Sequence, residues 1–200
     1  IPLRLVGSEM CIRDRNMTFA FAEPTIDLGW SQSHQAALLT GEIALETQPY
    51  SAWGGAVTAQ MYLPLERSQV WQQLTDYPRW TDYFPSLTQS KVIAKSQGRK
   101  QLYQAAGKTF LVFTAQVEIY LNVTETIHPL RHQLQFKLER GTFNEFSALL
   151  KLQDHRGGTL LTYSVQATPS IPIPTQIIQE GVRLDLPRNM RSLRRIICQS

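Results

Sequence analysis

The sequence has 200 residues, of which 42% are hydrophobic and 18% are charged, and its formal net charge at pH 7 is +4. These values are typical of one globular domain, and the length is too short for two hydrophobic cores of ordinary size. No window of about 18 consecutive apolar residues occurs, which excludes a conventional membrane-spanning helix.

The N-terminal residues have a different character from the rest of the chain. The stretch Ser8 to Arg15 resembles a translated sequencing adapter, so we expect residues 1–16 to be a non-native extension and Met17 to be the native start. If Cys11 is set aside, Cys198 remains alone, and one cysteine forms neither an internal disulfide nor a metal cluster. A reducing compartment is the simplest inference from the lone cysteine, so a cytoplasmic location is predicted. No secretory signal with a basic start and an apolar core is recognised in the sequence.

Regular structure is expected from Gly41 onward, in a single domain over residues 41–200. Residues 17–40 show no sustained hydrophobic period and are predicted to form a poorly structured tail, in which Ser33 to Leu39 could make a short helix. The segments Glu42 to Thr47 and Val57 to Leu63 alternate between apolar and polar residues. They are interpreted as two strands, or as one strand broken by a loop.

Two short helices are predicted next. Val70, Trp71 and Leu74 recur at helical spacing within Leu65 to Asp76, and Pro64 is a typical helix start. The dipeptide Tyr77-Pro78 ends this helix, because the residue before a proline is pushed out of the helical region. A second short helix is expected from Arg79 to Tyr83.

About six further antiparallel strands follow, each with one apolar and one polar face. Turns are predicted at Gln97-Gly98, at Gly107-Lys108 and at Arg156-Gly157-Gly158. The predicted strands are Leu87 to Ser96, Lys100 to Ala106, Phe110 to Glu125, His132 to Leu138, Asn144 to Leu152 and Leu161 to Ala167.

The segment from Pro172 to Cys198 is predicted to be a long amphipathic helix. Its apolar residues are spaced by three or four positions and form one stripe: Ile178, Val182, Leu186, Met190, Leu193 and Ile197. Its other face is basic and expected to be solvated: Arg183, Arg188, Arg191, Arg194 and Arg195. Pro187 predicts a kink near Leu184 or Asp185.

This order of elements resembles the helix-grip fold of the START-like superfamily, often labelled SRPBCC, in its polyketide cyclase/dehydrase and coenzyme Q-binding branch. The likeness extends from Gly41 to Ile197 and rests on these stretches: Leu63-Pro64 before Val70-Trp71, Phe84-Pro85 before a strand, Gly158 to Tyr163, and Pro172 to Pro174 ahead of Leu186 to Met190. The fold class implied is α+β: a curved antiparallel sheet of about seven strands, two short helices after the first strand, and a long C-terminal helix over the concave face.

A strongly bent sheet cannot be filled by one helix, so an apolar cavity is expected between them. The resemblance implies binding or transport of a hydrophobic small molecule there, such as an isoprenoid quinone, a lipid or a polyketide-like compound, without catalysis. The candidate lining residues are Phe84, Tyr103, Val117, Ile119, Leu134, Phe136, Phe146, Val182, Leu186 and Met190. Arg188, Arg191 and Arg195 could make a peripheral contact with an anionic membrane.

No catalytic residues, metal or cofactor are predicted, because the sequence has no phosphate loop and no metal-ligand spacing. Glu118, Glu145 and Tyr163 are conceivable acids or bases, and we expect them to be solvent-exposed. His128 and His132 are interpreted as a loop residue and a strand residue. Nucleic acid is not expected as a partner, because no aromatic residues interleave with the C-terminal arginines.

Two alternative functions remain open. One is an aromatase/cyclase acting on a polyketide-like substrate, which would need Glu118, Tyr163 or a histidine pointing inward with a shifted titration. The other is a protein- or ribosome-interaction module that uses the basic C-terminal helix.

Overall fold

The computed structural model describes residues 32–49, 54–96, 98–110, 113–170 and 175–199. For residues 32–35, 49, 108–110, 113–115 and 175–184 it describes the backbone alone. The predicted extension at residues 1–16 lies outside the described residues, as does most of the predicted tail.

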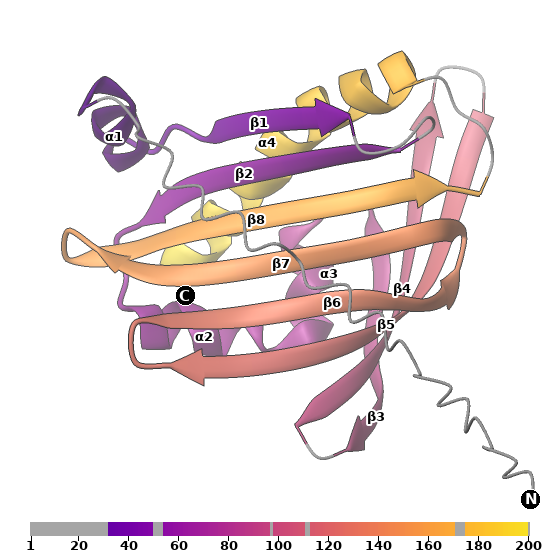
Figure 1. Cartoon of the computed structure of the whole chain (residues 1–200), viewed down its shortest axis with the longest axis horizontal. Helices are drawn as coiled ribbons and strands as arrows, with labels where there is room; N and C mark the ends of the chain where they lie inside the picture. Colours follow the sequence, from indigo (N-terminus) through magenta and orange to yellow (C-terminus); the bar gives the residue numbers. More distant parts are fainter. Residues whose placement is uncertain (1–31, 50–53, 97, 111–112, 171–174, 200) are drawn as a thin grey trace, which may run out of the picture.

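One antiparallel sheet of eight strands forms the body of the molecule, in the order β1-β2-β8-β7-β6-β5-β4-β3 (Figure 1). The predicted α+β architecture is confirmed, with eight strands where about seven were expected. The strands are β1 (Ala44–Pro49), β2 (Gly55–Leu63), β3 (Leu87–Ser96), β4 (Arg99–Phe110), β5 (Phe113–His128), β6 (Arg131–Gly141), β7 (Phe143–His155) and β8 (Gly158–Pro169).

The helices that follow β2 and the C-terminal helix lie on one side of this sheet (Figure 1). They are α2 (Arg67–Leu74), the 3-10 turn η1 (Tyr77–Arg79), α3 (Trp80–Tyr83) and α4 (Thr175–Gln199). A further helix, α1 (Gln32–Leu39), precedes the sheet and buries Leu38. No helix within the described ranges combines the length and the hydropathy that spanning a membrane requires.

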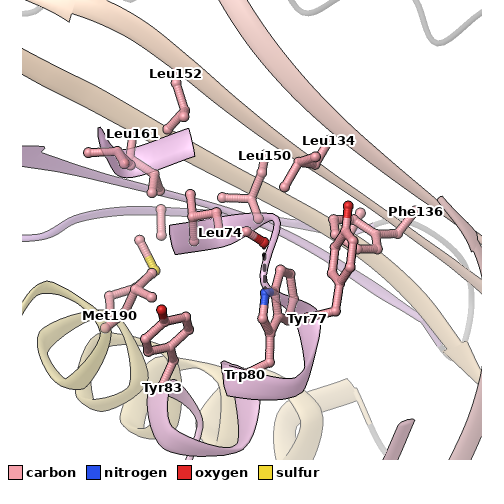
Figure 2. Close-up of a cluster of buried hydrophobic side chains, with 14 of the residues drawn as sticks. Leu74, Tyr77, Trp80, Tyr83, Leu134, Phe136, Leu150, Leu152, Leu161 and Met190 are labelled. Carbon is pink, nitrogen blue, oxygen red and sulfur yellow. Dashed lines mark hydrogen bonds between the residues drawn. The ribbon is translucent and has the colours of Figure 1, made fainter. Parts of the chain in front are cut away.

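Strict alternation gives the sheet a buried inner face, which we define as the face covered by α2, η1, α3 and α4. Its fully buried residues come from six strands and include Met61, Leu102, Leu121, Leu134, Leu150 and Leu161. Figure 2 shows Tyr83 of α3 and Met190 of α4 directed toward the same cluster as these sheet residues. The alternation predicted for β5 to β8 therefore identifies the buried face of the sheet correctly.

The first short helix begins two residues later than predicted, at Arg67. Glu66 caps it, because the Glu66 side chain and the Gln69 side chain each bond to the other residue's backbone N–H in a capping box. The segment at Pro78 is itself helical. Pro78 lies within the 3-10 turn η1, which tolerates a proline near its start.

The turn predicted at Gly107-Lys108 is wrong. Both residues lie inside β4, where Gly107 pairs with Gln116 and Lys108 pairs with Ala115 of β5. The ladder between β4 and β5 continues to the pair Phe110 and Phe113. A glycine alone is a weak turn signal, because a strand also accepts glycine in its interior at a modest entropic cost.

Helix α4 presents the predicted apolar stripe to β2 and α3 over the part whose side chains are described. The buried residues of the stripe there are Leu186, Met190, Leu193 and Ile197. The helix continues past Pro187. Arg194 is not a solvated residue of the basic face, because it is half-buried and its Nε donates to the Tyr62 carbonyl at 3.2 Å.

Gly141 closes the β5–β6 ladder, where it pairs with Ile119 beside a register shift between Tyr120 and Leu121. Its φ is +150°, and an added Cβ would collide with the Glu118 carbonyl oxygen and approach the Ile119 Cα to 2.8 Å. Gly107 lies on β4, two strands from β6 in the sheet, with nothing within 4 Å of such a Cβ.

We therefore expect Gly141→Ala to lower the free energy of unfolding by about 2 kcal/mol or more, because it combines a disfavoured φ with a backbone clash. Gly107→Ala is the matched control, and it should be neutral or stabilising by about 0.5 kcal/mol. Chemical denaturation of both variants measures the difference, and equal stabilities would contradict the pairing of Gly141 with Ile119.

Candidate functional site

The inner face is filled at one end and only partly covered at the other. On β8, Leu161 is completely buried, whereas the next inner-face residues toward the end of the strand keep accessible surface. The same change occurs along β5, β6 and β7. We call the half-buried residues the open-end set: Val117, Leu138, Phe146, Tyr163, Val165 and Ala167.

Strand pairing places the β7 and β8 members of the open-end set beside one another or beside other apolar residues of the inner face. Ala167 pairs with Phe146, and Val165 pairs with Ala148 on one side and Val57 on the other. Tyr163 follows on the same face, between Ala59 and Leu150. These neighbours are apolar, so this part of the inner face is an accessible apolar surface with one polar atom on β8, the Tyr163 hydroxyl oxygen.

The opposite end of the inner face is a closed aromatic core. Phe136 lies 5.2 Å from the Trp80 ring and 6.4 Å from the Tyr77 ring, measured between centroids. The Trp80 indole N–H also donates to the Leu74 carbonyl at 2.9 Å, as Figure 2 shows. Leu134 and Phe136, both predicted to line a cavity, are therefore fully buried in this core.

The other predicted lining residues divide between the two regions. Val117 and Phe146 belong to the open-end set, and Ile119 is buried beside Val117 on the same strand face. Phe84 follows α3, is partly buried, and lies 5.4 Å from the Trp80 ring. Leu186 and Met190 are buried on α4, and the Val182 side chain lies outside the described part of that helix.

Tyr103 requires a correction, because it lies on the outer face of the sheet. Its neighbours Leu102 and Gln104 are the buried inner-face residues of β4. Tyr103 instead lies 5.1 Å from the Tyr120 ring, and burial and the nearby Glu118 raise its pKa above the ordinary value. Leu102 and Tyr103 are adjacent large residues, so the alternation alone does not decide which of them faces inward.

The expected exposure of the three conceivable acid or base residues holds for Glu118 and Glu145 and is wrong for Tyr163. Tyr163 continues the inward alternation of Leu161 and Val165, and burial raises its pKa to about 12. The phenol therefore keeps its proton at neutral pH and can act as a hydrogen-bond donor.

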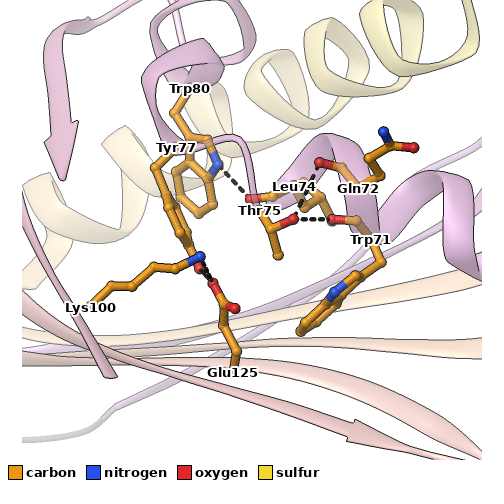
Figure 3. Close-up of polar contacts among 8 residues, drawn as sticks. All are labelled: Trp71, Gln72, Leu74, Thr75, Tyr77, Trp80, Lys100 and Glu125. Carbon is orange, nitrogen blue, oxygen red and sulfur yellow. Dashed lines mark hydrogen bonds and ion pairs between the residues drawn. The ribbon is translucent and has the colours of Figure 1, made fainter. Parts of the chain in front are cut away.

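A polar cluster that the sequence analysis did not identify joins η1 to the sheet (Figure 3). The Tyr77 hydroxyl donates to Glu125 Oε1 at 2.5 Å, and Lys100 Nζ lies 2.6 Å from the same oxygen. Lys100 Nζ also lies 5.1 Å from the centre of the Tyr77 ring. Burial and the Glu125 carboxylate raise the pKa of Tyr77 far above the ordinary value.

The alternation of inward and outward residues along β4 and β5 could have predicted this cluster. Glu125 has the inward parity of Leu121 and Val123 on β5, and Lys100 has the inward parity of Leu102 on β4. An acid and a base at inward positions of paired strands predict a buried ion pair. Glu125 lies roughly 26 Å along β5 from Val117, since each strand residue advances about 3.3 Å, so the cluster is separate from the open-end set.

His128 and His132 do not form a helical pair. His128 is the last residue of β5, not a loop residue, and His132 lies on β6, where its ring is 5.0 Å from the Trp71 ring. Burial and the neighbouring Arg67 lower the pKa of His132. Within the described ranges, no group of three or more His, Cys, Asp or Glu residues is arranged to hold a metal ion.

Comparison with known proteins gives one family and several solved structures. Residues 63–194 match the family model described as "Polyketide cyclase / dehydrase and lipid transport". A search of curated proteins finds no match.

Three solved structures illustrate the fold. A STAR-related lipid transfer protein from Xanthomonas axonopodis aligns with TM-score 0.65 and 12% identity, over 78% of this chain and 98% of its own. Human STARD10 aligns with TM-score 0.60 and 8% identity, over 78% and 73% of the two chains. The Zhui aromatase/cyclase from a Streptomyces species aligns with TM-score 0.54 and 10% identity, over 79% and 93%. At these identities the likeness shows the helix-grip fold alone, and it confirms the predicted fold class.

Replacing Tyr77 tests the polar cluster. Tyr77→Phe should lower the free energy of unfolding by about 1.5–3 kcal/mol, because it removes a hydrogen bond to a charged acceptor in a buried setting. Tyr62→Phe is the matched control, since the Tyr62 hydroxyl makes a long, exposed bond of 3.4 Å to the Arg156 carbonyl. Denaturant titration of both variants compares them, and equal losses would contradict the assigned role of Tyr77.

The raised pKa values of Tyr77 and Tyr163 predict that the protein becomes less stable at alkaline pH. Both phenols have an ordinary pKa of 10.0 and a higher one in the folded state, so above about pH 10 the folded chain binds more protons than the unfolded chain. The free energy of unfolding should then fall as the pH rises. The free energy of unfolding should fall less steeply with pH in Tyr163→Phe than in wild type. Parallel curves of unfolding free energy against pH for the two proteins, between about pH 9 and about pH 11, would refute this.

Proposed function

Because the chain belongs to the polyketide cyclase/dehydrase and lipid transport family, we propose that it binds a hydrophobic small molecule between the open end of the inner face and helix α4. The family and the fold indicate hydrophobic-ligand binding in general. The finer proposal is a carrier for an isoprenoid quinone, a lipid or a polyketide-like compound, which acts without catalysis.

The observation that carries the proposal is the open-end set itself. Its residues are apolar apart from one hydroxyl, yet they keep accessible surface on the face that the helices cover elsewhere. Covering such surface releases about 25 cal/mol per Å², so a guest of matching shape would be held mainly by the hydrophobic effect. Ligand sites are typically apolar with a few orienting polar groups, and this surface has that composition.

The titratable groups favour binding over chemistry. Glu125 and Lys100 neutralise each other at the closed end, away from the open-end set. Cys198 is partly buried, and burial raises the pKa of its thiol, which disfavours the reactive thiolate. Among the described residues, we find no nucleophile hydrogen-bonded to a base near the open-end set.

One observation favours the aromatase/cyclase alternative: Tyr163 points inward and holds its proton. A neutral phenol could donate a proton to a reacting carbonyl. To distinguish the two functions, wild type and Tyr163→Phe would be incubated with a linear polyketone thioester and the products separated by liquid chromatography. Cyclisation faster than in buffer, and lost in Tyr163→Phe, would replace the carrier proposal.

The basic face of α4 supports a proposal about location. Arg188, Arg191 and Arg195 are exposed, on the side away from the buried stripe. We propose that they make a peripheral contact with an anionic membrane, each contributing on the order of 1 kcal/mol near the surface. The alternative is a macromolecular partner. Co-sedimentation distinguishes the two: a membrane contact predicts that the protein sediments with vesicles containing phosphatidylserine and not with neutral vesicles.

Filling the open end tests the main proposal. Val165→Trp should weaken binding of the apolar fluorophore N-phenyl-1-naphthylamine at least about tenfold, because the larger side chain occupies the space of the guest. Gln166→Trp is the matched control, since Gln166 is the next residue of β8 and lies on the outer face.

Fluorescence titration measures both affinities, and thermal melts verify that each variant is folded. Ala167→Phe provides a second filling variant at the same end. Undiminished binding by a folded Val165→Trp variant and by Ala167→Phe would place the guest elsewhere and contradict the proposal.

A further inference from the structure

Two side-chain nitrogens at the closed end of the inner face are buried without a hydrogen-bond partner among the described residues: Arg67 Nη1 and His132 Nδ1. Arg67 is the first residue of α2, and His132 lies on β6. The two side chains interact, because Arg67 helps to lower the pKa of the His132 imidazole. Burying an unpaired polar atom costs free energy, so two such atoms on interacting side chains require a physical reason.

The other contacts of Arg67 join α2 to the ends of three strands. Arg67 Nη2 donates to the Pro129 carbonyl at 2.8 Å, in the turn between β5 and β6. The same nitrogen lies 3.4 Å from Asp154 Oδ2 on β7, and the Arg67 side chain is only 14% exposed. Arg67 therefore fastens the start of α2 to the sheet.

His132 lies on the inner face beneath α2. It has the inward parity of Leu134 on β6, and it pairs with Ile127 of β5 and Leu152 of β7, which offer no polar side-chain atom. The His132 ring lies 5.0 Å from the Trp71 ring of α2, in an edge-to-face arrangement. Packing against Trp71 thus fixes the imidazole while its Nδ1 stays buried.

The charged and titratable groups that surround His132 come from α2, β5 and β7. They are Glu66 and Arg67 at the start of α2, Glu125 and His128 on β5, and Asp154 on β7. Lys100 and Tyr77 hold the Glu125 carboxylate, and Arg67 holds that of Asp154. The Glu66 side chain caps the backbone of α2. Each nearby carboxylate is therefore engaged with another group, and the cation that acts on the imidazole is Arg67.

A neutral imidazole and a guanidinium are complementary partners. With its proton on Nε2, His132 has a lone pair on Nδ1, whereas Arg67 Nη1 carries only N–H donors. We propose that Arg67 Nη1 donates to Nδ1 of neutral His132, directly or through one water molecule, and that this bond is an acid-sensitive latch holding α2 over the closed end. A protonated His132 would present a donor and a second positive charge to Arg67, so acid opens the latch.

The direction of the pH dependence follows from burial and charge. Burial and Arg67 hold the pKa of His132 in the folded chain below its usual value of 6.5. At a pH below about 6.5 the unlatched chain therefore binds more protons than the latched chain. Local opening of α2 should become more frequent as the pH falls, and the latch should contribute fully above the ordinary pKa.

Amide hydrogen exchange of the full chain at about pH 7.5 and about pH 5.5 tests the latch. After correction for the intrinsic exchange rate, we expect the amides of α2 to exchange about three- to tenfold faster at the lower pH. The amides of Met61 and Leu161, at the centre of the sheet, should keep their protection. His132→Gln stays neutral at both pH values and should lose most of the change, whereas His128→Gln, at an exposed histidine, should keep it.

Nitrogen NMR of the histidine side chains gives a second measurement, which needs no variant. At about pH 7.5 we expect His132 to have a protonated Nε2 and an unprotonated Nδ1. A proton on Nδ1 would overturn the proposed bond. The latch is also wrong if exchange in α2 does not depend on pH in wild type, if His132→Gln keeps the full change, or if His128→Gln loses it. None of these outcomes depends on the proposed guest.

Discussion

The burial of α4 against the inner face of the sheet is the constraint on which the rest of the structure depends. Met190, Leu193 and Ile197 are almost completely buried where α4 meets β2 and α3. Arg194 reinforces this contact through its bond to the Tyr62 carbonyl. One helix cannot cover eight strands, so the remaining inner face must be filled by other elements or stay accessible.

The two ends of the inner face differ in how they are covered. Helices α2 and α3 and the turn η1 fill one end with Tyr77, Trp80 and Tyr83, whose polar atoms all find acceptors. The open-end set has no such filling from the described residues, and its one hydroxyl finds no acceptor there. Stability is therefore concentrated at the closed end, and the accessible apolar surface at the open end is available to a guest.

The alternation in the sequence predicted most of the fold because a one-residue error would have placed a whole apolar row in water. It was reliable from β5 to β8, where buried leucines alternate with polar residues. It failed at Tyr103, where two large residues are adjacent, and at Gly107, where a glycine inside a strand resembled a turn. Tyr163 was expected to be exposed and the Glu125–Lys100 pair was not identified, because a polar side chain was assumed to face solvent. Their positions in the alternation along each strand place them on the inner face.

Native mass spectrometry of the freshly purified protein, with organic extraction of what it releases, tests the central claim that the open end holds an apolar guest. We expect about one equivalent of an apolar molecule, lost on denaturation and absent from Val165→Trp. Observation of the bare chain alone, with a melting temperature that stays unchanged when quinones, polyketide-like compounds and lipids are added, would contradict an apolar guest at the open end.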